Sequence, residues 1–295
     1  MSSGLLSGSV VAISPLISPS MEELISSTGW NNPCIINYMS SSSVDPDETS
    51  LGIYPCEGSP AAVLVWIHGG GWVHGDRRRT RRIPEFCRRN NILFVSINYP
   101  RSSGNQKSII EMQLLAMKSF NSWLLDNEWS NHYPKAFKNI VLVSHSSGSH
   151  LVALIDKLYG WNESVSTMIL MDSGAYDLKT RFYLSRPAQR RNFEQLLRLD
   201  LYSNDQIESV LASYSPALIP SRQHGRPPRQ IEILTSARRG AMYSADQLAK
   251  SYSSSKDQIS LSRYDWDHDY FPESIGIESS VNSLILDAVH NKYSE

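Results

Sequence analysis

The sequence predicts an α/β domain in which helices cover both faces of a mostly parallel β-sheet. Short apolar, β-branched runs alternate with helical segments along most of the chain, and each run ends in turn-forming residues. This alternation is typical of parallel sheets, whose strands are buried on both faces. The length of 295 residues suits one large domain of this class. Active sites in such sheets lie at the carboxyl ends of the strands.

The expected elements follow one another in a regular order. The strands are predicted at residues 35–39, 50–54, 62–67, 92–97, 140–143, 167–171, 231–234 and 259–263. A polar loop at 40–50 joins the first two. The helices are predicted at about 79–90, 108–127, 147–159 and 243–255.

Residues 178–229 interrupt this alternation. They are polar and rich in arginine and proline, with one amphipathic stretch near 192–212. An insertion of this size between two core strands predicts a lid over the site, within a single domain that spans 1–295. The alternative is a surface excursion without functional weight.

Composition and charge exclude several classes of function. The net charge of −1 gives no reason to expect a nucleic-acid partner. Three cysteines, an odd and sparse set, argue against a disulfide framework. The N-terminus lacks the basic segment of a signal peptide, and no window is apolar for long enough to cross a membrane. We therefore expect a soluble, cytoplasmic protein without membrane insertion.

The first motif with chemical meaning is Ser-His-Ser-Ser-Gly at 144–148, which follows a buried strand and opens a helix. It approximates Gly-x-Ser-x-Gly, the turn that lifts a nucleophilic serine above a sheet, with Ser144 in place of the first glycine. Ser146 is then the nucleophile, and the Ser147 backbone N–H faces the reacting carbonyl. A plain serine-rich turn is the alternative.

The second motif is His-Gly-Gly-Gly-Trp at 68–72, after another strand. Successive glycines let the backbone approach a substrate closely and expose N–H donors, which an oxyanion hole requires. We expect Gly70 and Gly71 to supply them together with Ser147. The Gly-Lys-Ser/Thr of a phosphate-binding loop is missing, and no acidic or thiol partner has the spacing of a zinc ligand. No metal or organic cofactor is implied.

In these motifs the chain resembles the α/β-hydrolase superfamily. The similarity covers roughly residues 60–290 and is carried by Trp-Ile-His-Gly-Gly-Gly-Trp at 66–72, Ser-Ile-Asn-Tyr at 96–99, Ser-His-Ser-Ser-Gly-Ser-His-Leu at 144–151 and Ser-Gly-Ala-Tyr-Asp at 173–177. The HGGGW motif is that of a branch with hormone-sensitive-lipase-like esterases and kynurenine formamidases. The resemblance implies that nucleophile, acid and histidine occur in that order along the chain.

His268 is the expected base. It lies in a loop near the C-terminus, after the strand at 259–263, where the superfamily places its histidine. A surface histidine in an acidic loop is the alternative. His224, in the predicted lid, and His290, in the terminal helix, are weaker rivals.

The acid is harder to place. The superfamily position, just after the strand at 231–234, holds Arg238 and Arg239 and no carboxylate before Asp246. We favour Asp172, at the end of the preceding strand, where some lipases of the superfamily carry their acid. The other interpretations are that Asp265 or Asp267 orients the histidine, that the enzyme uses a dyad, or that it is inactive. Asp177 is expected to be structural.

Positive charge gathers in two stretches. Residues 76–89 contain seven arginines and two acidic residues, a net charge of +5, and residues 179–239 contain eleven basic and five acidic residues, a net charge of +6. One interpretation is a surface that docks an acidic partner, such as an acyl carrier protein, through Arg78, Arg79 and Arg82, or that binds an anionic substrate. The alternative is a solvated helix face.

These features predict a serine-dependent acyl hydrolase that acts on an ester, amide or thioester through an acyl-enzyme on Ser146. A second hypothesis replaces water with a substrate hydroxyl, which gives a transacylase or a lactone-forming release enzyme that uses a carrier-bound acyl group. A third is a catalytically inactive binding protein of the same fold.

Overall fold

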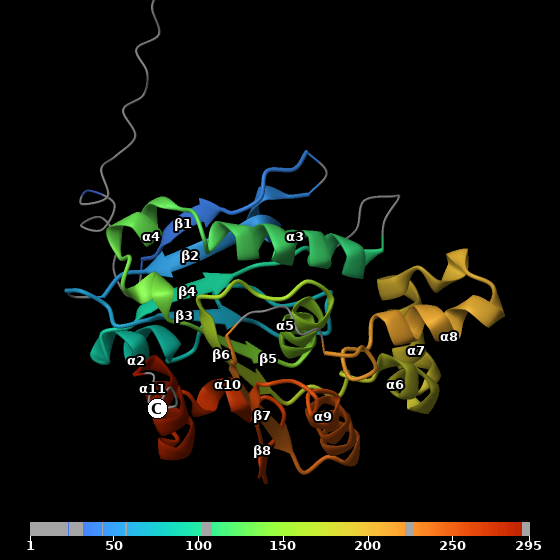
Figure 1. The fold of residues 1–295 in the computed structure, drawn as a ribbon. Coiled ribbons are helices and arrows are strands. Elements are labelled where there is room, and N and C mark those ends of the chain that lie inside the picture. Colours follow the sequence, from blue (N-terminus) through green and yellow to red (C-terminus); the bar gives the residue numbers. More distant parts are fainter. Residues whose placement is uncertain are drawn as a thin grey trace, which may run out of the picture.

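The computed structural model describes residues 23, 32–42, 44–56, 58–101, 108–221 and 227–290. Within them, one sheet of eight strands runs in the order β1-β2-β4-β3-β5-β6-β7-β8 (Figure 1). The strands are β1 (Cys34–Asn37), β2 (Ser50–Tyr54), β3 (Val63–Ile67), β4 (Leu93–Ile97), β5 (Ile140–His145), β6 (Val165–Met171), β7 (Gln230–Ser236) and β8 (Gln258–Tyr264). Every strand predicted from the sequence is present, with ends shifted by three residues or fewer.

The sheet is mostly parallel, as predicted. β2 pairs antiparallel with both β1 and β4, so β2 alone runs against the others. Every remaining pair of neighbours is parallel. The carboxyl ends of β3 to β8 therefore meet at one edge of the sheet.

The helices pack on both faces of this sheet (Figure 1). The α-helices are α2 (Ile83–Arg89), α3 (Ile109–Trp123), α4 (Glu128–His132), α5 (Ser147–Leu158), α6 (Leu178–Leu184), α7 (Pro187–Leu197), α8 (Asn204–Ser213), α9 (Arg239–Ser251), α10 (Tyr270–Ser274) and α11 (Ser279–Val289). Short 3₁₀ helices are η1 (Pro46–Thr49), η2 (Ala136–Lys138) and η3 (Leu199–Leu201).

Two helices begin at other residues than predicted. α2 begins four residues late because Arg81 has a φ of 53°, in the left-handed region that stops a helix, and Pro84 then sits in the first turn. α9 begins earlier than expected, at Arg239. By contrast α3 begins next to its predicted start, where Ser108 and Glu111 form a capping box.

Alternation along each strand divides the core into two layers. In β3, Val63, Val65 and Ile67 pack in one buried cluster with residues of α3, α5 and α9. Leu64 and Trp66, which point to the opposite face, pack in a second cluster with residues of α2 and α11. Burial on both faces fixes the register of the strands. It therefore also fixes where each strand ends relative to its neighbours.

The predicted lid segment folds into α6, α7, η3 and α8, which form a group at one side of the sheet (Figure 1). Asp177, expected to be structural, caps α6 by accepting a hydrogen bond from the Thr180 N–H at 2.9 Å. In the described part of the chain, none of the helices combines the length and the apolar character that a membrane crossing needs.

Candidate active site

Ser146 occupies a sharp turn between β5 and α5. Its backbone has φ 54° and ψ −119°, a conformation that costs free energy for any residue other than glycine. Close packing holds the turn, since a Cβ on Gly148 would lie 2.5 Å from the carbonyl oxygens of Ile67 and His68. Glycine is thus required at the end of the motif, as the Gly-x-Ser-x-Gly pattern predicts.

The departure from the pattern at Ser144 is accommodated locally. Its side chain is fully buried, and its hydroxyl lies 3.2 Å from Ser149 Oγ and 3.3 Å from the Ile169 carbonyl oxygen. The buried hydroxyl therefore has hydrogen-bond partners, so serine at this position leaves the turn intact.

The structure brings together the three residues predicted to act in catalysis. His268 Nε2 lies 3.0 Å from Ser146 Oγ, and His268 Nδ1 lies 2.7 Å from Asp172 Oδ2. The register of the sheet explains the meeting, because His145 pairs with Met171 and Met171 with Leu234, so Ser146 and Asp172 leave their strands side by side. The loop after β8 carries His268 across to them.

Asp172 is buried, and its carboxylate accepts hydrogen bonds from several groups. Its side chain is 0% exposed, and Oδ1 accepts a hydrogen bond from the Ser236 N–H at 2.8 Å. Burial alone would raise the pKa of this carboxyl, but hydrogen bonds from His268 and Ser236 and the charge of Arg238 outweigh it and hold the pKa well below its usual range. Asp172 is therefore ionised at neutral pH.

Arg238 adds a cation to this group. Its Nη2 lies 2.5 Å from Asp172 Oδ2 and 3.0 Å from His268 Nδ1. One imidazole nitrogen cannot both donate to the carboxylate and accept from the guanidinium. The shorter contact and the charge of Asp172 favour Nδ1 donating to Asp172, so we assign the neighbouring contact to close approach of the cation.

The contact of Arg238 with Asp172 is not evident from the sequence. There Arg238 is only a cation in place of the expected acid. The usable signal was the pairing of β6 with β7, which sets a carboxylate at the end of one strand beside a cation at the end of the next. Asp265 and Asp267, the alternatives to Asp172, are both exposed.

Gly70 and Gly71 of the HGGGW loop differ in the space that a side chain would have. Gly70 has a φ of 139°, and a Cβ there would lie 2.2 Å from the His74 carbonyl oxygen, so packing requires glycine. Gly71 has a φ of 59° and open space around the position of a Cβ. Gly71 and Ser147 line the cavity above Ser146. Their role as oxyanion donors stays a prediction.

Trp72 ties the glycine loop to its surroundings. Its indole N–H donates to His150 Nδ1 at 3.2 Å, and its carbonyl oxygen accepts from Gln113 Nε2 at 2.7 Å. His150 Nε2 lies 2.8 Å from the Tyr214 carbonyl oxygen, which makes His150 a neutral imidazole with both nitrogens bonded. Burial lowers the pKa of His150 to about 4.

His145 contacts the backbone of His268, a contact that the sequence does not reveal. Its Nε2 lies 2.9 Å from the His268 carbonyl oxygen, and the two ring centroids are 4.4 Å apart. Burial, with a smaller effect of His268, lowers the pKa of His145 to about 4. A neutral His145 can donate to this carbonyl and hold the loop in place.

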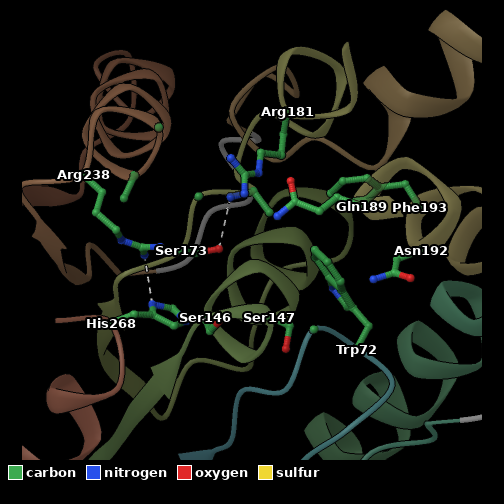
Figure 2. A pocket seen from close by; sticks show the side chains of 15 residues that line it. Trp72, Ser146, Ser147, Ser173, Arg181, Gln189, Asn192, Phe193, Arg238 and His268 are labelled. Atoms are coloured by element: carbon green, nitrogen blue, oxygen red, sulfur yellow. Dashed lines mark hydrogen bonds between the residues drawn. The ribbon is translucent and has the colours of Figure 1, made fainter. Parts of the chain in front are cut away.

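Two cavities meet at Ser146 and His268. The first, of about 360 Å³, lies under α6 and α7, which contribute Arg181, Gln189, Asn192 and Phe193 to its wall (Figure 2). The second, of about 300 Å³, lies on the other side of the glycine loop and is lined in part by Arg79, Arg81, His68 and His145. The predicted lid segment thus supplies one wall of the first cavity.

The remaining residues predicted from the sequence lie away from Ser146, His268 and Asp172. Arg78 pairs with Asp76 at 2.6 Å, and Arg82 lines a third cavity beside α2. His290 is exposed at the end of α11, and His224 lies outside the described residues. No cluster of three or more potential metal ligands occurs in the residues that the structure describes.

Comparison with known proteins agrees with this arrangement. A family model described as BD-FAE, an esterase family of the α/β-hydrolase fold, matches residues 51–179. The HGGGW loop and the serine turn both lie within the matched residues. The chain has the α/β-hydrolase fold. No curated protein matches the sequence significantly.

Several solved α/β-hydrolases share the fold at low sequence identity. An esterase of Pyrobaculum calidifontis gives a TM-score of 0.63 at 15% identity, over 82% of this chain and 81% of its own. Esterase 2 of Thermogutta terrifontis gives 0.61 at 16%, over 89% and 95%, and also has a structure phosphonylated by sarin. Esterase B of Lactobacillus rhamnosis gives 0.63 at 14%, over 88% of each chain.

Proposed function

We propose that this α/β-hydrolase hydrolyses esters through an acyl-enzyme on Ser146. The observation that carries the proposal is the continuous contact from Asp172 through His268 to Ser146, at 2.7 Å and 3.0 Å. In this arrangement the Ser146 hydroxyl donates to Nε2, and the Nδ1–H donates to the carboxylate. This is the tautomer in which histidine can accept the serine proton.

The reaction then proceeds in two halves. Ser146 Oγ attacks the ester carbonyl carbon while its proton passes to His268 Nε2, and the imidazolium that forms is stabilised by ionised Asp172. The tetrahedral intermediate expels the alcohol, which takes the proton from His268. Water attacks the acyl-enzyme in the same way, its proton passes to His268 and then to Ser146 Oγ, and the acid leaves.

The negative charge of each intermediate needs donors fixed in advance. Gly71 and Ser147 both border the cavity above Ser146, so their backbone N–H groups are our candidates, with Gly70 as a third. Each such donor is worth roughly 3–4 kcal/mol of transition-state stabilisation. Ser147 also opens α5, whose N-terminus adds a favourable dipole.

The similarities support an esterase. The matched family and the three solved structures are esterases, and the phosphonylated Thermogutta enzyme reacts with an organophosphorus compound. A transacylase would use the same acyl-enzyme. The second cavity favours this alternative, because it borders Ser146 from the opposite side and could admit an alcohol.

Replacement of Ser146 by alanine tests the proposal. Wild type should hydrolyse 4-nitrophenyl butyrate and be labelled covalently by a fluorophosphonate probe. Ser146→Ala should do neither while keeping the circular dichroism spectrum of wild type. Ser122→Ala, which changes an exposed serine of α3, serves as the control. Turnover by Ser146→Ala within tenfold of wild type would reject Ser146 as the nucleophile.

A further inference from the structure

Two arginines line the cavity above Ser146. Arg181 reaches into it from α6, and Arg238 reaches in from the residue before α9 (Figure 2). Among the described residues that line this cavity, none is acidic. Asp172, the nearest carboxylate of the catalytic group, is 0% exposed and does not line it.

No described anion balances the charge of Arg181. None of the ion pairs between described residues involves it, although its side chain is half-buried. Burial, together with the nearby charge of Arg238, lowers the pKa of Arg181. A guanidinium nevertheless stays protonated at neutral pH. Asp172 balances the charge of Arg238, so Arg181 leaves a net positive charge beside this cavity, which attracts an anion.

Arg238 can contribute to the same anion site while it holds Asp172. Its Nη2 bonds Asp172 and its Nε lies 3.0 Å from Ser236 Oγ, so two of its three nitrogens are used internally. Of the described residues, none accepts a hydrogen bond from Nη1. The side chain is 53% exposed, which leaves that nitrogen within reach of a ligand in the cavity.

The other residues that line the cavity can contact the uncharged part of such a ligand. Gln189 and Asn192 lie three residues apart on α7, so they share one side of that helix, and both amides line the cavity (Figure 2). Trp72 and Phe193 pack edge to face, with ring centroids 5.7 Å apart, and give it an apolar section. The cavity thus combines cations, amide donors and an apolar wall next to the nucleophile.

We propose that this cavity selects esters whose acyl chain carries a carboxylate, and that Arg181 is the principal ligand of that carboxylate, with Arg238 as its second cation. The planar fork of a guanidinium matches the two oxygens of a carboxylate. The inference rests on the proposed ester hydrolysis at Ser146. It adds a specificity-determining residue that comes from the predicted lid.

Binding tests the proposal without turnover. In a Ser146→Ala background, calorimetry should show that monomethyl adipate binds at least tenfold more tightly than methyl hexanoate, which has the same chain length without charge. Arg181→Gln should remove most of that difference. Arg239→Gln is the matched control, because Arg239 is the exposed neighbour of Arg238 and does not line the cavity.

Equal affinity for the two esters in the Ser146→Ala protein, or no binding of the adipate ester at millimolar concentration, overturns the proposal. So does an Arg181→Gln protein that keeps the full difference. None of these results depends on whether Ser146 is the nucleophile, so they leave the proposed hydrolysis to be judged by its own test.

Kinetics give a second readout. The ratio of kcat/KM for 4-nitrophenyl hydrogen adipate to that for 4-nitrophenyl hexanoate should fall at least tenfold in Arg181→Gln. Arg181→Lys, which keeps the charge but loses the fork, should recover part of the ratio, and Arg239→Gln should leave it unchanged. A ratio that does not move in Arg181→Gln contradicts the assignment.

Discussion

At the scale of single residues, the unusual feature is a carboxylate shared between a histidine and an arginine. Asp172 Oδ2 lies 2.7 Å from His268 Nδ1 and 2.5 Å from Arg238 Nη2, while Oδ1 accepts from the Ser236 N–H. Three donors fix the orientation of the carboxylate, and they keep it charged. Arg238, at the position where the superfamily usually carries its acid, therefore holds Asp172, the acid that we predict on the neighbouring strand.

Replacement of Asp172 by asparagine should lower kcat by about 10⁴-fold, because the imidazole loses the partner that selects its tautomer and stabilises its charged form. The change is measured with 4-nitrophenyl butyrate. Asp246→Asn is the control, since Asp246 pairs with Arg263 on the surface, and it should leave kcat unchanged. A near-normal rate in Asp172→Asn with a slow Asp265→Asn or Asp267→Asn protein would transfer the role to that residue.

At the scale of elements, two adjacent glycines of the HGGGW loop have different surroundings. A side chain at Gly70 collides with the backbone at His74, whereas one at Gly71 enters open space beside the nucleophile. The two positions therefore respond differently to the same substitution.

Gly71→Ala should lower kcat by about two to three powers of ten and cost only about 1–3 kcal/mol of stability from its positive φ. Gly70→Ala should instead lower the unfolding midpoint markedly, because the backbone must move. Denaturation with urea and turnover of 4-nitrophenyl butyrate separate the two effects. An unchanged turnover in Gly71→Ala would show that the loop does not face the substrate.

The strands, the serine turn and the glycine loop were predictable because each is encoded by neighbouring residues. Buried strands are apolar without interruption, and turns need glycine. The contact of Asp172 with His268 was predictable from topology, since carboxyl ends of adjacent parallel strands meet, together with the resemblance to lipases that carry their acid on this strand. The contact of Arg238 with Asp172 and the placing of Arg181 over Ser146 were not, because they depend on side-chain geometry between residues far apart in sequence. The polar pattern of α6 and α7 does not say which side faces the site.

At the scale of the whole molecule, three buried histidines link stability to pH. Burial lowers the pKa of His68, His145 and His150 from 6.5 to about 4. The unfolded chain therefore binds more protons than the folded one between those values, so the free energy of unfolding should fall as pH drops from about 6.5 to about 4, by up to about 1.4 kcal/mol per pH unit for each histidine. Asp172, whose pKa is also lowered, adds to the loss only below the usual pKa of an aspartate, 3.8.

Urea denaturation at pH 7, 6 and 5 measures this slope. His150→Gln, which removes one of the three titrations, should flatten it. Stability that is constant over this range would contradict the neutral state of the buried histidines.

Arg78, Arg79 and Arg82 remain a predicted docking surface for an acyl carrier protein. If a carrier binds there, changing Arg78, Arg79 and Arg82 together to glutamate should raise KM for a carrier-bound acyl substrate and spare a small free thioester. Added salt should weaken use of the carrier in parallel, because exposed charges are screened beyond about 8–10 Å. Equal effects on both substrates would leave only a solvated surface.

The two cavities that converge on Ser146 have a consequence for the order of events. One compartment can keep the acyl group while the other releases the departing alcohol, so a second nucleophile can enter where the first product left. If the proposed acyl-enzyme forms, we expect ping-pong kinetics, with a product that depends on the partition between water and competing alcohols. The contents of the second compartment, rather than the catalytic residues, would then decide whether the acyl group is hydrolysed or passed on.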